Sequence, residues 1–388
     1  IETSTLDTSP VAQINDTKYQ TLQDAFNAVE DNLEEPTVIN LLRNTTILNE
    51  NSTPIVSENK NIFLNLNGYS ISAGNESGIE NRGQLEIGDK QKDPIITAND
   101  LTNNGDYYFI SNENGAFISN NTGINSSIAN SYIKIDLTNS TGKHQLVINA
   151  EISSKGGYDT GYVTVTESPE APAYNSSSGR IISMSGIYRA RDFVSELESG
   201  KIYYLHLGYR KTNSKGEGED RFKINSIKLN PAGNIIATNG NCITNLGNLT
   251  ISDGLTLNSN MYAVNNTGEL QINGGYIYSE NGIYNDDDGI VNFNNGKIYK
   301  EENEYETTSY AIYNNSNGTI NINGGNIEYL ATSSANLYGI YNNSTGTVNI
   351  NGGNISTYLA ANFGGTYYLY GIYNNSTGQI NLVDGNIY

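Results

Sequence analysis

The chain has 388 residues, a formal net charge of −20, 29 tyrosines and no tryptophan. Its length predicts two or three domains. The single cysteine, Cys242, excludes internal disulfides and cysteine-rich metal sites, and its place beside an apolar repeat position predicts a buried, inert thiol. The acidic balance argues against nucleic-acid binding, because a phosphate backbone requires a basic face. No run of apolar residues reaches the roughly 18 that a membrane-spanning helix requires.

The first elements in chain order suit the start of a stack of strands. The leader IETSTLDTSP is polar, and we expect it to be flexible. A short amphipathic helix is predicted from Thr21, with Asp24 completing a capping box. Its apolar face consists of Leu22, Ala25, Phe26 and Val29. We expect this helix to cover the open end of the first layer of strands, and we predict that strands follow at 37–42, 61–67 and 69–72.

A repeated motif then organises most of the chain. Its clearest copy is YGIYNNSTGTVNINGGNI, from Tyr338 to Ile355. Each copy carries an apolar anchor, and these anchors are Ile79, Ile243, Val264, Ile283, Ile312, Ile340 and Ile372. After Ile243 they are spaced by 21, 19, 29, 28 and 32 residues. Repeats of about 20–50 residues indicate solenoids, propellers or arrays.

Each copy reads as three short strands separated by Asn-Asn and Gly-Gly turns. Strands this short suit a coil in which each strand pairs in parallel with its counterpart in the next copy. This periodicity is typical of a parallel β-helix, and the predicted fold class is therefore all-β, with a β-solenoid as the main architecture.

Two columns of identical residues support this prediction. Two residues after each anchor lies an asparagine that should point inward and bond to the next copy: Asn81, Asn245, Asn266, Asn285, Asn314, Asn342 and Asn374. The residue between anchor and asparagine should point outward. We therefore predict an exposed tyrosine ladder made of Tyr284, Tyr313, Tyr341 and Tyr373.

The repeats are interrupted for about 135 residues, where longer alternating strands take over. These are predicted at 131–137, 144–152, 162–166, 201–210 and 221–229, and such strands with Gly, Asn and Ser turns indicate an antiparallel β-sandwich. A helical turn is predicted at 190–198. The stretches 95–98 and 235–238 look like the third strand of a coil on either side of the interruption.

Residues 100–234 hold 13 Lys and Arg against 14 Asp and Glu, and the remainder holds 8 against 27. The insert is therefore balanced in charge and the repeats are acidic.

On these motifs the chain resembles the right-handed parallel β-helix proteins of the pectate-lyase-like superfamily, and within them the non-enzymatic repeats of bacterial surface adhesins. The insert, with its YDTGYVTV stretch, resembles the jelly-roll modules of bacterial surface and carbohydrate-active proteins. The resemblance implies a β-helix with an amino-terminal helix over residues 1–98, an inserted β-sandwich over 99–234, and continuing β-helix repeats over 235–388.

The candidate ligand contacts form two groups, one in the insert and one along the repeats. Tyrosine can stack on a sugar ring while its hydroxyl donates a hydrogen bond. Candidate ligand contacts in the insert are Tyr158, Asp159, Tyr162, Tyr174, Arg189, Arg191, Tyr209 and Arg210, and the outer ladder Tyr284, Tyr313, Tyr341 and Tyr373 is a second candidate surface. Three adjacent acids, Asp286, Asp287 and Asp288, could hold Ca²⁺, although a solvated turn explains them as well. His144 and His206 lack metal-ligand spacing.

We therefore expect a secreted, cell-surface bacterial adhesin without catalytic residues or an obligatory cofactor. Its stalk would display a sandwich that binds a glycan or a host or neighbouring-cell surface protein, without inserting into a membrane. Because no capping sequence follows the last repeat, we expect a monomeric piece of a longer chain. Two alternatives remain open: a Ca²⁺-assisted polysaccharide lyase or glycoside hydrolase, and a purely structural surface stalk.

Overall fold

A computed structural model of the protein describes residues 9–47, 52–88, 100–112, 115–138, 140, 142–212, 218–302, 307–331, 335–359 and 367–388. The chain is nearly all β and divides into two compact units. Unit 1 comprises Ile1–Lys90 and Ala232–Tyr388, and unit 2 comprises Gln91–Pro231. The predicted segment 95–98 lies outside the described residues, as does most of the polar leader.

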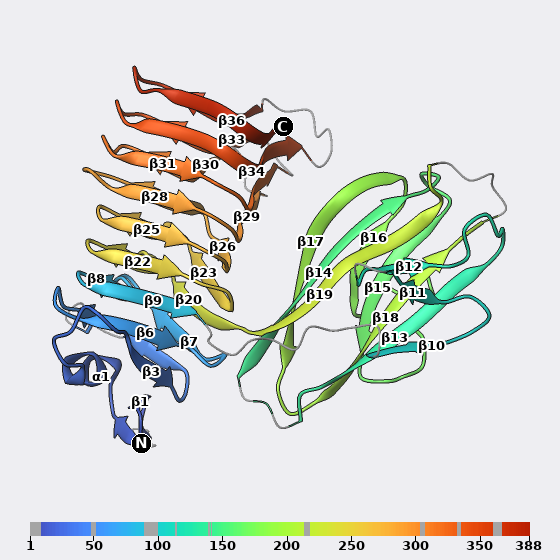
Figure 1. The fold of residues 1–388 in the computed structure, drawn as a ribbon, viewed down its shortest axis with the longest axis horizontal. Helices are drawn as coiled ribbons and strands as arrows, with labels where there is room; N and C mark the ends of the chain where they lie inside the picture. Colours follow the sequence, from blue (N-terminus) through green and yellow to red (C-terminus); the bar gives the residue numbers. More distant parts are fainter. Residues whose placement is uncertain are drawn as a thin grey trace, which may run out of the picture. The chain divides into compact units, whose positions relative to one another are not determined.

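Unit 1 is built from three ladders of parallel strands, whose stacking is visible in Figure 1. The first ladder runs through β3 (Thr37–Leu41), β6 (Asn61–Asn65), β9 (Gln84–Gly88), β22 (Asn248–Ile251), β25 (Glu269–Ile272), β28 (Ile290–Phe293), β31 (Thr319–Ile322), β34 (Thr347–Leu359) and β36 (Ile380–Ile387). Two short strands, β1 (Ala12–Ile14) and β2 (Thr17–Tyr19), pair antiparallel at its start.

The second ladder runs through β4 (Thr45–Ile47), β7 (Ser70–Ala73), β20 (Gly233–Ala237), β23 (Leu255–Ser259), β26 (Tyr276–Tyr278), β29 (Lys297–Glu302) and β32 (Asn326–Ala331), and it continues into β34. The third runs through β5 (Ile55–Val56), β8 (Ile79–Asn81), β21 (Ile243–Asn245), β24 (Tyr262–Asn266), β27 (Asn281–Asn285), β30 (Thr307–Asn314), β33 (Ala335–Asn342) and β35 (Tyr368–Asn374). From β3 to β34 the chain visits the three ladders in the same order each time, so equivalent residues of successive repeats pair with one another.

The hydrophobic core of unit 1 follows directly from this register. The anchors from Ile79 to Ile340 are buried in one continuous cluster. The helix α1 (Leu22–Ala28) adds Leu22, Ala25 and Phe26 to the same cluster. Thr21 is its N-cap, as predicted, and accepts a hydrogen bond from the Asp24 N–H at 3.0 Å. That this helix serves as the cover of an open end remains a prediction.

The buried asparagine column is confirmed. Six of its seven side chains, from Asn81 to Asn342, are 0% exposed. Each of these donates from Nδ2 to Oδ1 of the next asparagine, over 2.7–3.0 Å, and the last bond reaches Asn374. The same nitrogens also donate to main-chain carbonyls, such as Gly247 and Gly268. Each of these buried amide nitrogens therefore has a partner, while the oxygen at the start of the column, Asn81 Oδ1, is buried without one.

Unit 2 consists of two five-stranded antiparallel sheets around one hydrophobic core. The first sheet has the order β10 (Leu101–Asn103), β13 (Ile128–Asp136), β18 (Ile202–Arg210), β15 (Thr160–Thr166) and β16 (Arg180–Met184). The second has the order β11 (Phe109–Ser111), β12 (Phe117–Ser119), β19 (Arg221–Pro231), β14 (Lys143–Ser153) and β17 (Ile187–Glu198). In β13, Ile133 and Ile135 are buried whereas Lys134 and Asp136 are exposed, as their alternation predicts.

The predicted helical turn at 190–198 is wrong, because this segment lies in β17. That strand pairs only with β14 among the described strands of its sheet, and most of its residues are exposed or half-buried. An edge strand with both faces largely solvated lacks the clean two-residue alternation that identifies β13, which is why the sequence pattern was misinterpreted.

The asparagine column generates a stability prediction. Replacing Asn285 by alanine removes its bonds to Asn266 and Asn314 and leaves buried polar atoms short of a partner, so we expect unfolding to become easier by about 1–3 kcal/mol. Urea denaturation of the full chain measures the change. Asn323→Ala is the matched control, because Asn323 donates to Asn294 on the exposed surface at 2.8 Å. Equal effects of the two substitutions would contradict a special role for the buried column.

Candidate binding surfaces

The outer face of the sheet containing β15 and β18 carries a layer of aromatic and cationic side chains. Tyr162 lies flat across Gly208, where a β-carbon would collide with its ring, and is only 3% exposed. Its hydroxyl donates to Asn130 Oδ1 at 3.3 Å. The guanidinium of Arg180 stacks over the same ring, 4.5 Å from its centroid. Burial raises the pKa of Tyr162, which keeps the ring neutral at physiological pH.

A second pair extends this layer to the surface. The guanidinium of Arg210, at the end of β18, lies 4.4 Å from the ring centroid of Tyr174, which is 43% exposed. Arg180 connects the two pairs, because its Nη2 donates to the Tyr174 carbonyl at 2.8 Å and its Nε to Thr164 Oγ1 at 2.9 Å. We call Tyr162, Tyr174, Arg180 and Arg210 the Arg–Tyr cluster. Within the described parts of the chain, neither arginine forms an ion pair with a carboxylate, so both positive charges face outward uncompensated.

Two predicted contacts in the insert do not belong to a surface. Tyr209 is 0% exposed and packs into the core of unit 2, and Asp159 is also 0% exposed. Asp159 Oδ1 accepts from the Thr212 N–H at 2.8 Å. Because neither side chain reaches solvent, we remove both from the candidate site. Tyr158, which is 53% exposed, lies beneath the Lys155 ammonium.

The other predicted arginines lie on the second sheet. Tyr188 and Arg189 line a hollow of about 190 Å³ together with Glu151, Arg221 and Lys223. Charged side chains around this hollow form ion pairs with one another or with nearby acids: Lys223 bonds Glu151 at 2.8 Å, and Arg221 pairs with Glu219. The guanidinium of Arg191 stands over the rings of Tyr188 and Phe193. The two faces of unit 2 therefore both combine tyrosine with arginine. Lys223 and Arg221 at the hollow are paired with acids, whereas the two arginines of the Arg–Tyr cluster form no ion pair within the described residues.

The tyrosine ladder of unit 1 exists and is broader than predicted. Tyr284, Tyr313, Tyr341 and Tyr373 stack in order with centroids 5.2–5.5 Å apart. A second row that the sequence analysis missed, Tyr310, Tyr338 and Tyr370, stacks beside it at 5.2–5.3 Å. Rings are nearly parallel within a row and nearly perpendicular between neighbours such as Tyr310 and Tyr313, at 85°. In this herringbone arrangement the faces of the rings pack against neighbouring tyrosines.

Consequently the ladder is half-buried, not fully exposed as expected. Its rings cover one another, so they present edges and hydroxyl groups to solvent more than the open ring face on which a sugar stacks. The recurring spacing YxIYN in the sequence was the signal for the second row. Burial and neighbouring tyrosines raise the pKa of Tyr310 to about 12, and burial also raises the pKa values of Tyr284, Tyr313 and Tyr338.

The three aspartates are not gathered into a metal-binding group, and a Ca²⁺ site at these residues stays a prediction. Asp286 Oδ1 accepts from Asn315 at 2.9 Å, and Asp287 has a left-handed backbone, with φ of 51°. No group of three or more His, Cys, Asp or Glu side chains suited to holding a metal ion occurs within the described residues, these aspartates included. Arg82 follows β8, which is three strand pairings from β27, the strand that precedes the aspartates, and it forms an ion pair with Glu80.

Cys242 is 0% exposed, and burial raises the pKa of its thiol to about 12, which suits an inert residue.

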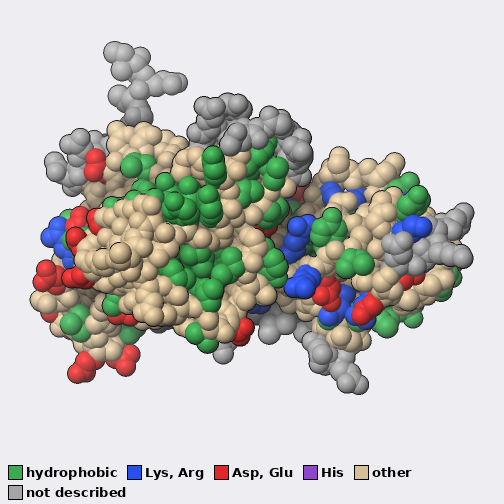
Figure 2. All heavy atoms as spheres, turned by 90° about the horizontal axis from the view of Figure 1, so that it is seen from above, with side chains coloured by type: hydrophobic (Ala, Val, Ile, Leu, Met, Phe, Trp, Pro, Cys, Tyr) green, Lys and Arg blue, Asp and Glu red, His purple; other side chains and the backbone are tan. Residues whose placement is uncertain are grey.

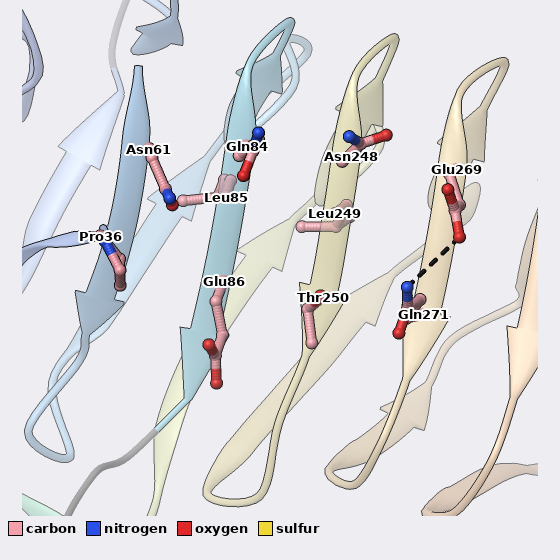
Figure 3. A pocket seen from close by; sticks show the side chains of 10 residues that line it. All are labelled: Pro36, Asn61, Gln84, Leu85, Glu86, Asn248, Leu249, Thr250, Glu269 and Gln271. Atoms are coloured by element: carbon pink, nitrogen blue, oxygen red, sulfur yellow. Dashed lines mark hydrogen bonds between the residues drawn. The ribbon is translucent and has the colours of Figure 1, made fainter. Parts of the chain in front are cut away.

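A polar hollow of about 350 Å³ lies on the outer face of the first ladder (Figure 3). Side chains from β9, β22 and β25 line it, among them Gln84, Glu86 and Thr250. Gln271 Nε2 donates to Glu269 Oε1 at 3.2 Å across its far side. Amide and carboxylate groups in such an open hollow suit a hydroxyl-rich ligand more than an apolar one.

One end of unit 1 is apolar at its surface. Leu382 and Val383 of β36 are 64% and 76% exposed, and Tyr388 is 60% exposed. Figure 2 looks onto this end, where green side chains gather. In the described residues β36 pairs with β34 alone. This end therefore presents apolar side chains and a free strand edge.

Comparisons with known proteins give little beyond this geometry. No family model matches the chain, and no curated protein sequence matches it. Among solved structures, it is similar to the cleaved adhesin domain of Lys-gingipain from Porphyromonas gingivalis, with 12% identity over 35% of this chain and 93% of that one and a TM-score of 0.24. It is also similar to the CBM22 and GH10 modules of a Clostridium thermocellum endo-1,4-beta-D-xylanase complexed with xylohexaose, with 13% identity, 35% and 26% coverage and a TM-score of 0.22. The chain thus spans about a quarter of that xylanase. No helix among the described residues is both long and apolar enough to cross a membrane.

The herringbone generates a pH prediction. A tyrosine whose pKa is raised from about 10 in the unfolded chain to about 12 in the fold binds more protons when folded, so stability falls as pH rises above about 10. We expect the melting temperature to drop between pH 10 and pH 12. Tyr310→Phe keeps the ring and removes the ionisable hydroxyl, and should lessen the drop. An identical drop in wild type and variant would contradict this origin.

Proposed function

We propose that the protein is an extracellular adhesin of a bacterial cell surface that binds an acidic glycan without cleaving it. Unit 1 serves as a right-handed β-solenoid stalk, and unit 2 is an inserted jelly-roll β-sandwich that carries the binding face. Two observations support this architecture: the chain visits three parallel ladders cyclically, and unit 2 has two antiparallel sheets around its own core.

The Arg–Tyr cluster is the observation that carries the proposal. Tyr174 offers a partly exposed ring beside the guanidinium of Arg210, and Arg180 lies between the two tyrosines. A guanidinium can bind a carboxylate or sulfate through two parallel hydrogen bonds, while an aromatic ring packs on the apolar face of a sugar. Uncompensated charge and a ring in one layer suit a uronic acid or a sulfated sugar.

The test is a glycan array that contains uronic, sulfated and neutral oligosaccharides, followed by calorimetry on the full chain. We expect acidic glycans to bind, and Tyr174→Ala and Arg210→Ala each to weaken binding at least tenfold, about 1.4 kcal/mol. Affinity should fall as salt concentration rises, because charge pairing contributes. Melting temperatures should stay unchanged in both variants, since both side chains lie at the surface.

Tyr188→Ala is the matched control, because Tyr188 is 49% exposed and also packs beneath an arginine, but on the opposite sheet. It should leave affinity within about twofold of wild type. A loss with Tyr188→Ala and none with Tyr174→Ala would move the site to the second sheet. Absence of glycan binding by the wild type would overturn the proposal and favour a purely structural stalk.

A further inference from the structure

A buried cluster of charged side chains lies where β18 ends and β19 begins. Lys211 directly follows β18, and its side chain is 0% exposed. It pairs with Asp220, which directly precedes β19, and its Nζ lies 3.8 Å from Asp159 Oδ2. The side chains of Asp220 and Asp159 are 10% and 0% exposed. The proposed glycan site does not use these three residues.

We propose that Lys211 and Asp220 become joined by an amide bond between Nζ and Cγ, formed by the folded protein itself with Asp159 as the proton carrier. The bond would connect the two sheets of unit 2, because β18 belongs to one and β19 to the other. It requires no metal, cofactor or added reagent.

The chemistry is a condensation that balances without a co-reactant. Proton transfer within the pair gives a neutral amine and a neutral carboxylic acid. The Nζ lone pair then attacks Cγ of Asp220, one oxygen leaves as water, and an amide remains. Asp159 takes the surplus proton from Nζ as the bond forms and delivers it to the departing oxygen. Nothing is oxidised or reduced.

Burial disfavours the charged form of Asp220, but the hydrogen bonds from Lys211 and the Gly123 N–H outweigh burial and lower the pKa of the carboxyl. The reaction therefore has to begin with a proton transfer from Lys211 to Asp220 inside the buried pair. Removing two charges from water costs several kcal/mol per ion, a cost that the neutral pair formed by this transfer avoids. Asp159 Oδ2 is buried without a hydrogen bond, so it is available to receive a proton. Holding amine and carboxyl in contact also replaces a collision between separate molecules, an effect worth about 10⁵ M or more in effective concentration.

The surroundings of Asp220 match the needs of the attack. When Nζ adds to Cγ, negative charge develops on the carboxyl oxygens. The Gly123 N–H donates to Oδ2 at 2.9 Å, and the Tyr209 hydroxyl donates to Oδ1 at 3.3 Å. Each oxygen therefore has a donor in place to stabilise that charge. Burial and the adjacent carboxylates raise the pKa of Tyr209 far above its usual range, so its hydroxyl keeps its proton.

The measurement is the intact mass of the purified full chain, followed by trypsin digestion. We expect a mass lower than the sequence predicts by one water molecule. Trypsin does not cut after an acylated lysine, so residues 211–215 (KTNSK) and 216–221 (GEGEDR) should appear as one joined species. An Asp-Gly succinimide, for example at Asp288, would give the same loss elsewhere, so the loss must map to the joined peptides.

Three variants complete the test. Lys211→Arg keeps the charge and cannot form this amide, so it should have the full sequence mass. Asp159→Asn should leave most of the chain uncrosslinked. Lys223→Arg is the matched control, because Lys223 bonds Glu151 at 2.8 Å in a more exposed pair, and it should still lose one water.

A wild-type mass equal to that of the sequence, or a loss that maps outside the joined peptides, would overturn the proposal without requiring any variant to fold. Full cross-linking in the Asp159→Asn variant would overturn the role given to Asp159. Retention of the loss in Lys211→Arg would show that another residue had reacted.

Discussion

The hydrogen bonds between identical buried asparagines hold the register of unit 1. Each amide donates to the next repeat and also to a main-chain carbonyl, so a repeat displaced by one residue would bury several unpaired polar atoms at once. Because this column fixes the register, the apolar anchors, the tyrosine rows and the outer asparagines fall into columns of like residues. Loops of different length between repeats are accommodated outside these columns.

The core of unit 2 is packed without such repeated columns. Its sheets are antiparallel and its strands have unrelated sequences, so its core is an irregular cluster of large side chains, in which Phe109 and Phe222 meet edge to face. The charged residues of its interior are concentrated at one place, around Lys211. The two units thus differ in how they accommodate costly buried groups: unit 1 repeats one amide pairing along a column, and unit 2 gathers its buried Asp and Lys side chains in a single local network.

Repetition explains what could be predicted from the sequence. The inward asparagines were visible because the same residue recurs at the same offset, and the cap at Thr21 because its partners are local. Tyr209 was misjudged although it shares the alternation of Leu205 and Leu207, which placed it in the core. The contact between Arg180 and Tyr162 depends on the register of β15 with β16, which contains an irregularity between Val163 and Thr164. No local pattern encodes such a pairing.

The position of the insert has a consequence for the order in which the chain becomes structured. Asn81 and Asn245 are neighbours in the buried column, yet they are 164 residues apart in sequence. During synthesis the strands β7, β8 and β9 leave the ribosome well before β20, β21 and β22, which pair with them. For that interval their open edges are templates for pairing with another chain. Outward-facing charges on these strands, Glu80 and Glu86, oppose such pairing, because stacking two identical edges would bring like charges together. Unit 2 therefore lengthens the period in which the nascent stack must be protected, and the acidity of the repeats contributes that protection.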